Sequence, residues 1–121
     1  MAEPPDKWSL GRASEDLVAR HMESIGYSIL DRNFIAPGGE LDILCLKDRT
    51  LFVVEVRSRR HGATRPLDTI SPAKQAHIFD ATDVFMAMRA PDVNEVRFVV
   101  AEVEWQTNQP KINLVFDPFI S

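Results

Sequence analysis

The sequence predicts an α/β domain in which a mixed β-sheet is flanked by helices. Three observations support this fold class. A helix, three strands, a helix and two strands follow one another, residues 51–54 are apolar on both faces of a strand, and the second helix can link two parallel strands. The chain has 121 residues, 45% of them hydrophobic and 26% charged, as in ordinary globular domains. We expect a flexible leader at residues 1–9 and a single domain at residues 10–121.

The first helix is indicated by apolar residues at helical spacing, namely Leu10, Ala13, Leu17, Val18, Met22 and Ile25. Gly26 follows them, where a helix-terminating glycine belongs. Strands are expected at residues 27–34, 40–46 and 51–57, separated by a Pro37-Gly38-Gly39 turn and a polar turn at residues 47–50. These strands can form an antiparallel meander.

The second helix is predicted to begin at Pro72, with Ser71 as its N-cap, and to extend to about Met88. Its buried side is expected to contain Ile78, Phe79, Phe85 and Met86. Polar residues at 58–70 predict a mobile loop that crosses over to this helix. Two further strands are expected at residues 95–103 and 111–116.

The composition favours a cytoplasmic protein without disulfides or a membrane segment. No apolar run approaches the roughly 20 residues that span a bilayer, and Cys45 is the only cysteine. The net charge of −4 argues against bulk attraction to nucleic acid. A basic segment at residues 57–65 is a local exception, which fits either a solvated loop or the main source of a salt-dependent DNA affinity.

Two acidic residues interrupt otherwise apolar strands. A hairpin symmetric about the Asp48-Arg49 turn places Asp42 directly opposite Glu55 on one face of the sheet. Like charges in that position destabilise a sheet. A divalent cation would offset the repulsion, and Mg²⁺ prefers a few carboxylate oxygens completed by water and phosphate. The spacing therefore predicts a metal site at these two residues.

Other polar residues near this pair leave alternatives open. The same hairpin places Glu40 opposite Arg57, where an ordinary surface ion pair is the simpler interpretation. Glu15 lies at the edge of the first helix's apolar stripe and either reaches the site or is an exposed carboxylate. Cys45 is expected in the core, because no zinc-type Cys or His spacing accompanies it.

Two neighbouring motifs carry a family resemblance. Gly-Glu-Leu-Asp-Ile at 39–43 and Leu-Phe-Val-Val-Glu-Val-Arg-Ser-Arg at 51–59 resemble the YraN-like family of largely uncharacterised bacterial proteins, related to PD-(D/E)XK nucleases and archaeal Holliday junction resolvases. The similarity extends over roughly residues 10–103 and includes Glu15, Asp31-Arg32-Asn33, Ser71-Pro72-Ala73-Lys74 and Arg97-Phe98. The resemblance implies a restriction-endonuclease-like fold.

The resemblance also implies a nuclease-type site. Mg²⁺ or Mn²⁺ would be held by Asp42 and Glu55, with the Val56 carbonyl and Glu15 as further ligands. The family usually has lysine where this chain has Arg57, which can bind phosphate but cannot act as a general base. The residues implied in catalysis are Asp42, Glu55, Arg57, Glu15 and Lys74. Those implied in nucleic-acid binding are Arg57, Arg59, Arg60, Arg65 and Lys74.

We therefore expect a metal-dependent nuclease that hydrolyses phosphodiester bonds in structured or branched DNA. Arg57 keeps a second interpretation open, namely a catalytically impaired nuclease-fold module that binds nucleic acid or a protein partner. A hydrolase of small phosphoesters lacks a recognisable pocket motif. A homodimer would fit the resemblance, because related resolvases pair two active sites on a two-fold substrate.

Overall fold

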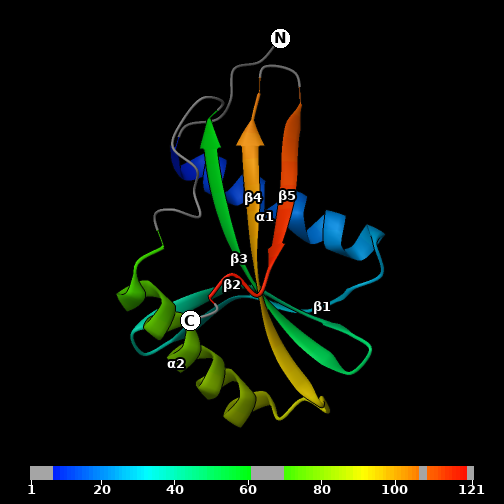
Figure 1. Cartoon of the computed structure of the whole chain (residues 1–121), viewed down its shortest axis with the longest axis vertical. Helices are drawn as coiled ribbons and strands as arrows, with labels where there is room; N and C mark the ends of the chain where they lie inside the picture. Colours follow the sequence, from blue (N-terminus) through cyan, green and yellow to red (C-terminus); the bar gives the residue numbers. More distant parts are fainter. Residues whose placement is uncertain (1–6, 61–69, 107–108, 120–121) are drawn as a thin grey trace.

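The computed structural model describes residues 7–60, 70–106 and 109–119, with side chains from residue 10 onwards and without that of residue 60. The elements are α1 (Lys7–Ser24), β1 (Ser28–Ala36), β2 (Gly39–Lys47), β3 (Thr50–Arg60), α2 (Pro72–Arg89), β4 (Glu95–Trp105) and β5 (Pro110–Phe116). The described strands form one sheet in the order β1-β2-β3-β4-β5, with β3 and β4 parallel and the other neighbours antiparallel (Figure 1). The predicted element order and the restriction-endonuclease-like fold are confirmed.

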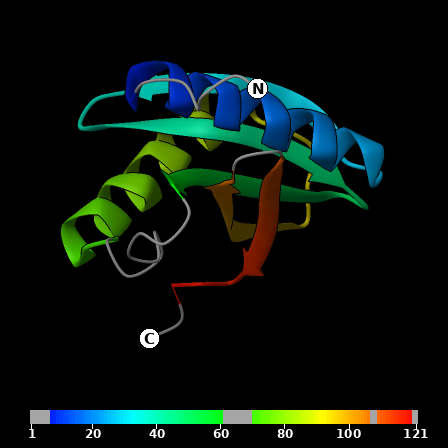
Figure 2. The ribbon, with the colours of Figure 1, turned by 90° about the horizontal axis from the view of Figure 1, so that it is seen from above.

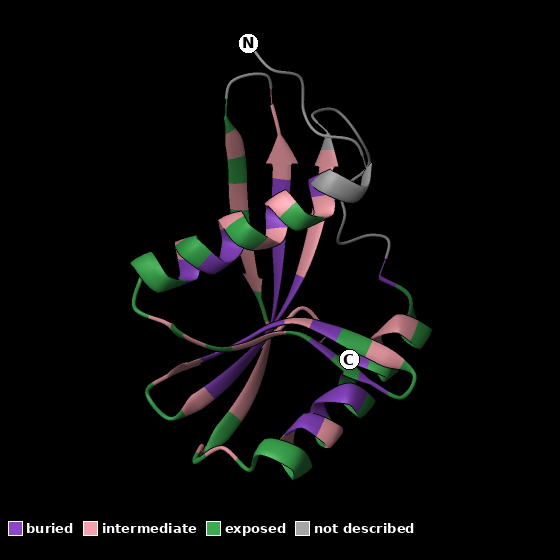
Figure 3. Cartoon of the chain, turned by 180° about the vertical axis from the view of Figure 1, so that it is seen from behind, coloured by how far each residue is buried: buried purple, intermediate pink, exposed green. Residues whose placement is uncertain are grey.

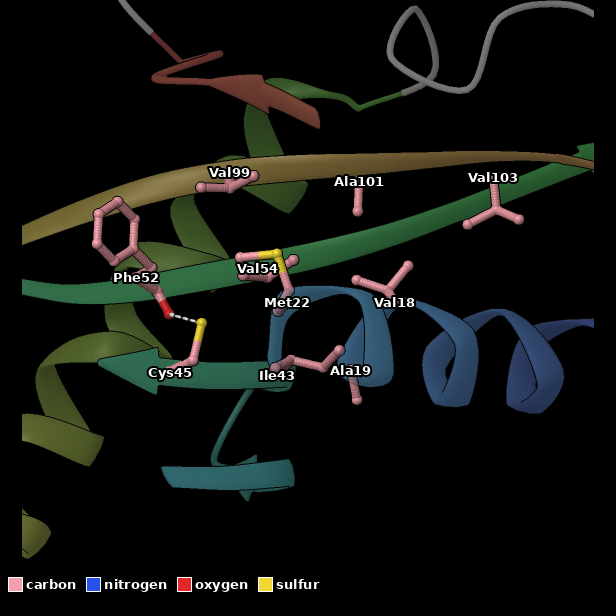
Figure 4. Packing of buried hydrophobic residues seen from close by; sticks show 10 residues of the cluster. All are labelled: Val18, Ala19, Met22, Ile43, Cys45, Phe52, Val54, Val99, Ala101 and Val103. Atoms are coloured by element: carbon pink, nitrogen blue, oxygen red, sulfur yellow. Dashed lines mark hydrogen bonds between the residues drawn. The ribbon is translucent and has the colours of Figure 1, made fainter. Parts of the chain in front are cut away.

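The two helices lie on opposite faces of the sheet (Figure 2). α1 packs on a cluster that includes Val18, Ala19, Met22, Ile43, Cys45, Phe52, Val54, Val99, Ala101 and Val103 (Figure 4). α2 packs on a second cluster that includes Phe34, Ala36, Leu41, Leu44, Leu51, Val53, Ile78, Ala81 and Phe85. Alternate residues of β3 thus enter different clusters, as its apolar run predicted. Figure 3 shows buried residues along the strands and along one side of each helix.

The β2–β3 hairpin fixes the register on which the site depends. Asp48 and Arg49 have φ of 52° and 59°, as a two-residue type I′ turn requires. The paired residues are Leu46 with Leu51 and Leu44 with Val53, as the symmetric hairpin predicted. Because side chains alternate between faces, this register determines which residues of both strands face α2.

The ends of both helices follow the predicted signals. Gly26 has φ of 102°, and the N–H of Tyr27 donates to the Met22 carbonyl at 3.0 Å, so the chain turns out of α1 there. Ser71 Oγ accepts a hydrogen bond from the Lys74 N–H at 3.1 Å at the start of α2. This cap places Lys74 in the first turn of α2. No helix in the described ranges is long and apolar enough to span a bilayer.

Three expectations about element boundaries and burial were wrong. Residues 58–60 extend β3 instead of starting a loop, because parallel pairing continues to Arg60 opposite Trp105. Helix α1 begins at Lys7, so residues 7–9 belong to the helix and not to the leader. Phe79 is 36% exposed, because the side of α2 that faces the sheet consists of Ile78, Ala81, Thr82 and Phe85. The rest of the expected leader and residues 61–69 of the expected loop lie outside the described residues.

The β1–β2 hairpin approaches α2 closely at Gly39. An added Cβ there would lie 3.3 Å from the His77 carbonyl oxygen, which is tighter than ordinary contact. We expect Gly39→Ala to lower the free energy of unfolding by about 1 kcal/mol, the lower end of the range for overpacking. Gly11→Ala is the matched control, because an added Cβ there meets nothing within 4 Å. In a helix it should instead raise stability by roughly 0.5–1 kcal/mol.

Urea unfolding of the two variants and the natural protein provides the measurement. Equal stability of Gly39→Ala and the natural protein would show that the hairpin is not packed tightly against α2.

Candidate active site

Asp42 and Glu55 lie together where the β2–β3 ladder ends. The last paired residues are Ile43 of β2 and Val54 of β3. Asp42 is the next residue on β2, and Glu55 is the next residue on β3. Asp42 Oδ2 accepts a hydrogen bond from the Val56 N–H at 2.8 Å, which ties its carboxyl group to β3. Glu55 is only 5% exposed. The predicted register therefore brings two acidic side chains together in a largely buried position.

The electrostatics of the pair show how unfavourable two ionised carboxylates would be. Burial, a hydrogen bond with Glu55 and the Glu55 charge, in that order, raise the pKa of Asp42 to about 8. A hydrogen bond between two carboxyl groups exists only while one of them is protonated. Without a cation, the pair thus retains a proton at neutral pH.

A cation from α2 partly compensates the Glu55 charge. Lys74 Nζ lies 3.3 Å from Glu55 Oε2 as an ion pair. The same oxygen is buried and has no hydrogen-bond partner among the described residues. Lys74 lies in the first turn of α2, where the free N–H groups and the helix dipole also favour an anion. The structure thus places Lys74 beside the acidic pair, and its expected role in nucleic-acid binding stays a prediction.

Glu15 comes from α1 and stands beside this pair. Burial and then the charge of Asp42 raise the pKa of Glu15, whereas a hydrogen bond from Asn33 lowers it. Glu15 is therefore within electrostatic reach of Asp42. In the described part of the chain, however, no three His, Cys, Asp or Glu side chains converge into one metal-holding group. The candidate site thus consists of the Asp42 and Glu55 carboxyl groups, with the Glu15 carboxyl group beside them.

The donor set fits Mg²⁺ or Mn²⁺. The groups at the centre are carboxylate oxygens, and one of them, Glu55 Oε2, is buried without a hydrogen bond among the described residues. Mg²⁺ keeps several waters and commonly uses one or two protein carboxylates together with substrate phosphate. Val56 donates its N–H to Asp42, and its side chain packs on the opposite face of the sheet. A ligand role for the Val56 carbonyl stays a prediction.

The arginines of the predicted basic segment differ in their surroundings. Arg57 pairs across the parallel ladder with Glu102, which is 8% exposed. Arg59 forms an ion pair with Glu104 at 3.5 Å, so part of its charge is already balanced. The side chain of Arg60 and all of Arg65 lie outside the described residues. Whether the segment acts as one basic surface stays a prediction.

Asn33 is a polar residue of this region whose role the sequence reasoning missed. In the amide orientation that satisfies its hydrogen bonds, its nitrogen donates to Glu15 Oε1 at 2.9 Å and to Glu40 Oε1 at 3.1 Å. An asparagine within a strand pattern was the available signal, because asparagine tolerates the left-handed backbone that Asn33 adopts, with φ of 53°. A groove of about 410 Å³ lies beside it, lined by Arg12, Glu15, Asp16, Arg32 and Asn33.

Comparison with known proteins identifies the family. The family model described as Uncharacterised protein family UPF0102 matches residues 14–103. The chain belongs to this family. A UPF0102 protein of Clostridium beijerinckii is 38% identical over 114 residues, 91% of this chain and 92% of the relative. One of Syntrophotalea carbinolica is 38% identical over 107 residues, 86% and 85% of the two chains. One of Clostridium perfringens is 33% identical over 109 residues, 89% of each chain.

Membership of UPF0102, the YraN family, confirms the resemblance found in the sequence. The matched region includes the acidic pair and the polar residues around it, namely Glu15, Asn33, Asp42, Glu55 and Lys74. The UPF0102 assignment alone identifies no activity, and the geometry of the site is the evidence for its chemistry.

The raised pKa of Asp42 makes the stability of the metal-free protein depend on pH. Between its ordinary value of 3.8 and about 8, the folded state holds a proton that the unfolded state has released. The free energy of unfolding therefore falls as the pH rises through this window. Asp42→Asn cannot ionise, and we expect it to flatten the decline, as measured by urea unfolding with a chelator at several pH values.

Asp83→Asn makes the same chemical change on the exposed side of α2 and should leave the decline as it is. An equally steep decline in Asp42→Asn would assign the pH dependence to another group.

Proposed function

We propose that this protein is a metal-dependent nuclease that hydrolyses phosphodiester bonds in structured or branched DNA. The observation that carries the proposal is the buried pair of Asp42 and Glu55, with Lys74 at 3.3 Å from Glu55. Two carboxylates beside a cationic group at a helix N-terminus suit a metal ion and a phosphate bound side by side. The resemblance to junction resolvases supports branched DNA as the substrate and a homodimer as the active form. The buried free thiol of Cys45 suits the cytoplasm.

In this proposal, Asp42 and Glu55 would hold Mg²⁺ or Mn²⁺ and would release their shared proton when the ion binds. Such an ion would lower the pKa of an attacking water and offset negative charge on the phosphate. Lys74 orients the phosphate from the N-terminus of α2. Arg57 lies two residues beyond Glu55 on the same face of β3 and stabilises negative charge that develops on the phosphate.

One observation favours a second function. Arg57 occupies the position at which the family usually has lysine, and a guanidinium cannot accept a proton in the working pH range. If the chemistry requires a titratable amine there, the protein is a catalytically impaired nuclease-fold module that binds nucleic acid or a protein partner. The nuclease would cleave DNA only with the metal, whereas the module would bind its partner without cleaving it.

Cleavage of a four-way DNA junction, compared with linear duplex, tests the proposal. We expect cleavage of the junction with Mg²⁺ or Mn²⁺ and none with a chelator. Glu55→Gln should slow it by about 100-fold or more, the upper range for groups that support metal ligands. Glu95→Gln makes the same change at the start of β4, away from the acidic pair, and should leave the rate unchanged. Metal-independent cleavage, or cleavage that survives Glu55→Gln, would contradict the assignment of this site.

Arg57→Lys separates the two functions. If a titratable amine is required, the variant should cleave faster, by as much as about 100-fold, the lower end of general-base contributions. Arg20→Lys makes the same change on the exposed side of α1 and is the matched control, which should have little effect. A purely electrostatic role of Arg57 predicts only a small change. If both variants and the natural protein are inactive while DNA binding persists, the binding module replaces the nuclease.

A further inference from the structure

Asn33 connects three elements at the side of the acidic pair. Its amide nitrogen lies between Glu15 of α1 and Glu40 of β2, at 2.9 and 3.1 Å from their Oε1 atoms. Arg32, the preceding residue, forms an ion pair with Asp16 of α1 at 2.7 Å. Consecutive residues of β1 thus fasten this strand to α1, and Asn33 does so through the Glu15 carboxyl group, which Asp42 influences electrostatically.

The backbone explains why this side chain points where it does. The β1–β2 register shifts between Ile29 and Asp31, and Asn33 then adopts a φ of 53°. Asparagine accepts this conformation more readily than most residues with a side chain. Glycine would accept it equally well but has no amide to donate. The conformation and the hydrogen-bond donor are therefore separable by mutation.

Glu15 is held beside the acidic pair through Asn33, which lies level with Asp42 in the β1–β2 ladder and donates to Glu15 Oε1. It is partly buried and lies near Asp42, and both factors favour its neutral form. The hydrogen bond from Asn33 favours the ionised form and fixes the direction of Oε1. Glu40 is exposed, so its hydrogen bond with Asn33 contributes little to the free energy of folding and mainly orients the Asn33 amide.

We propose that Asn33 is a positioning residue, which fixes the direction of the Glu15 carboxyl group beside the cation site formed by Asp42 and Glu55. Because Glu15, Asp42 and Glu55 do not converge into one metal-holding group in the described structure, Glu15 would act on that cation through a bound water. This inference rests on the proposed function, since it requires a metal ion at the pair. It assigns Asn33 a role that the UPF0102 match does not provide.

Mn²⁺ binding to the DNA-free protein, measured by calorimetry, tests the proposal without any cleavage assay. Asn33→Gly keeps the backbone conformation and removes the donor, so Mn²⁺ affinity should fall by about tenfold, the lower range for groups that orient metal ligands. Asp48→Gly is the matched control, because Asp48 has nearly the same φ, 52°, in the β2–β3 turn. Both variants gain similar freedom in the unfolded chain, so only the loss of affinity should distinguish them.

A double-mutant cycle shows whether Asn33 acts through Glu15. Glu15→Gln should weaken Mn²⁺ binding by a similar factor, and adding Asn33→Gly to it should cause little further loss. A purely structural role would instead give losses that multiply, and this result would overturn the proposal. Unchanged Mn²⁺ affinity in Asn33→Gly would overturn it as well.

Mn²⁺ binding by the natural protein and by Glu55→Gln separates this inference from the proposed function. If the natural protein binds Mn²⁺ and Glu55→Gln abolishes binding, the metal site stands whatever Asn33→Gly does. If the natural protein does not bind Mn²⁺, the metal site and the role of Asn33 both fall.

Discussion

Two carboxyl groups buried side by side are an unfavourable arrangement, and most of the local structure around Asp42 and Glu55 compensates for it. Removing a charge from water costs several kcal/mol unless a partner offsets the loss. The β2–β3 ladder ends before these residues, and the Val56 N–H donates instead to the Asp42 side chain. Lys74 supplies a positive charge from α2. A proton or a metal ion has to supply the remainder.

The packing of β3 fixes Asp42 and Glu55 in this arrangement. Residues on either side of the strand enter different hydrophobic clusters, one beneath α1 and one beneath α2. A shift of register by one residue would move Glu55 to the face beneath α1, into the cluster that contains Phe52 and Val54, and away from Lys74. The hydrophobic clusters therefore hold the acidic residues in place, although those residues alone would favour separation.

Much of this arrangement follows from the sequence because it depends on local rules. A two-residue turn and strict alternation are sufficient to place Asp42 beside Glu55, and a Ser-Pro pair is sufficient to start α2. The length of β3 could not be predicted in the same way. Its last residues are polar and resemble a loop, and they are ordered by pairing with β4, which comes much later in the chain.

Two errors concerning side chains have a similar origin. The buried side of α2 includes the small residues Ala81 and Thr82, which carry a weaker apolar signal than Phe79, and Phe79 packs instead against Phe98 at the edge of the helix. Asparagine is a residue type that tolerates a left-handed backbone, so the sequence could indicate the conformation of Asn33. Its hydrogen-bond partners, however, lie on α1 and β2. A sequence pattern shows that such a residue is unusual, and only the tertiary structure shows which carboxylates it orients.

The chemistry of the donors limits which cation the site can favour. Cys45 is buried on the α1 side of the sheet, and burial raises the pKa of its thiol to about 12, so it offers no thiolate to a soft metal. The acidic pair offers oxygen alone, which suits hard cations that keep part of their water. Two carboxylates leave much of the coordination sphere to water and to a substrate phosphate. Binding of the cation and of nucleic acid would then be coupled, and by thermodynamic linkage each would raise the affinity for the other by the same factor.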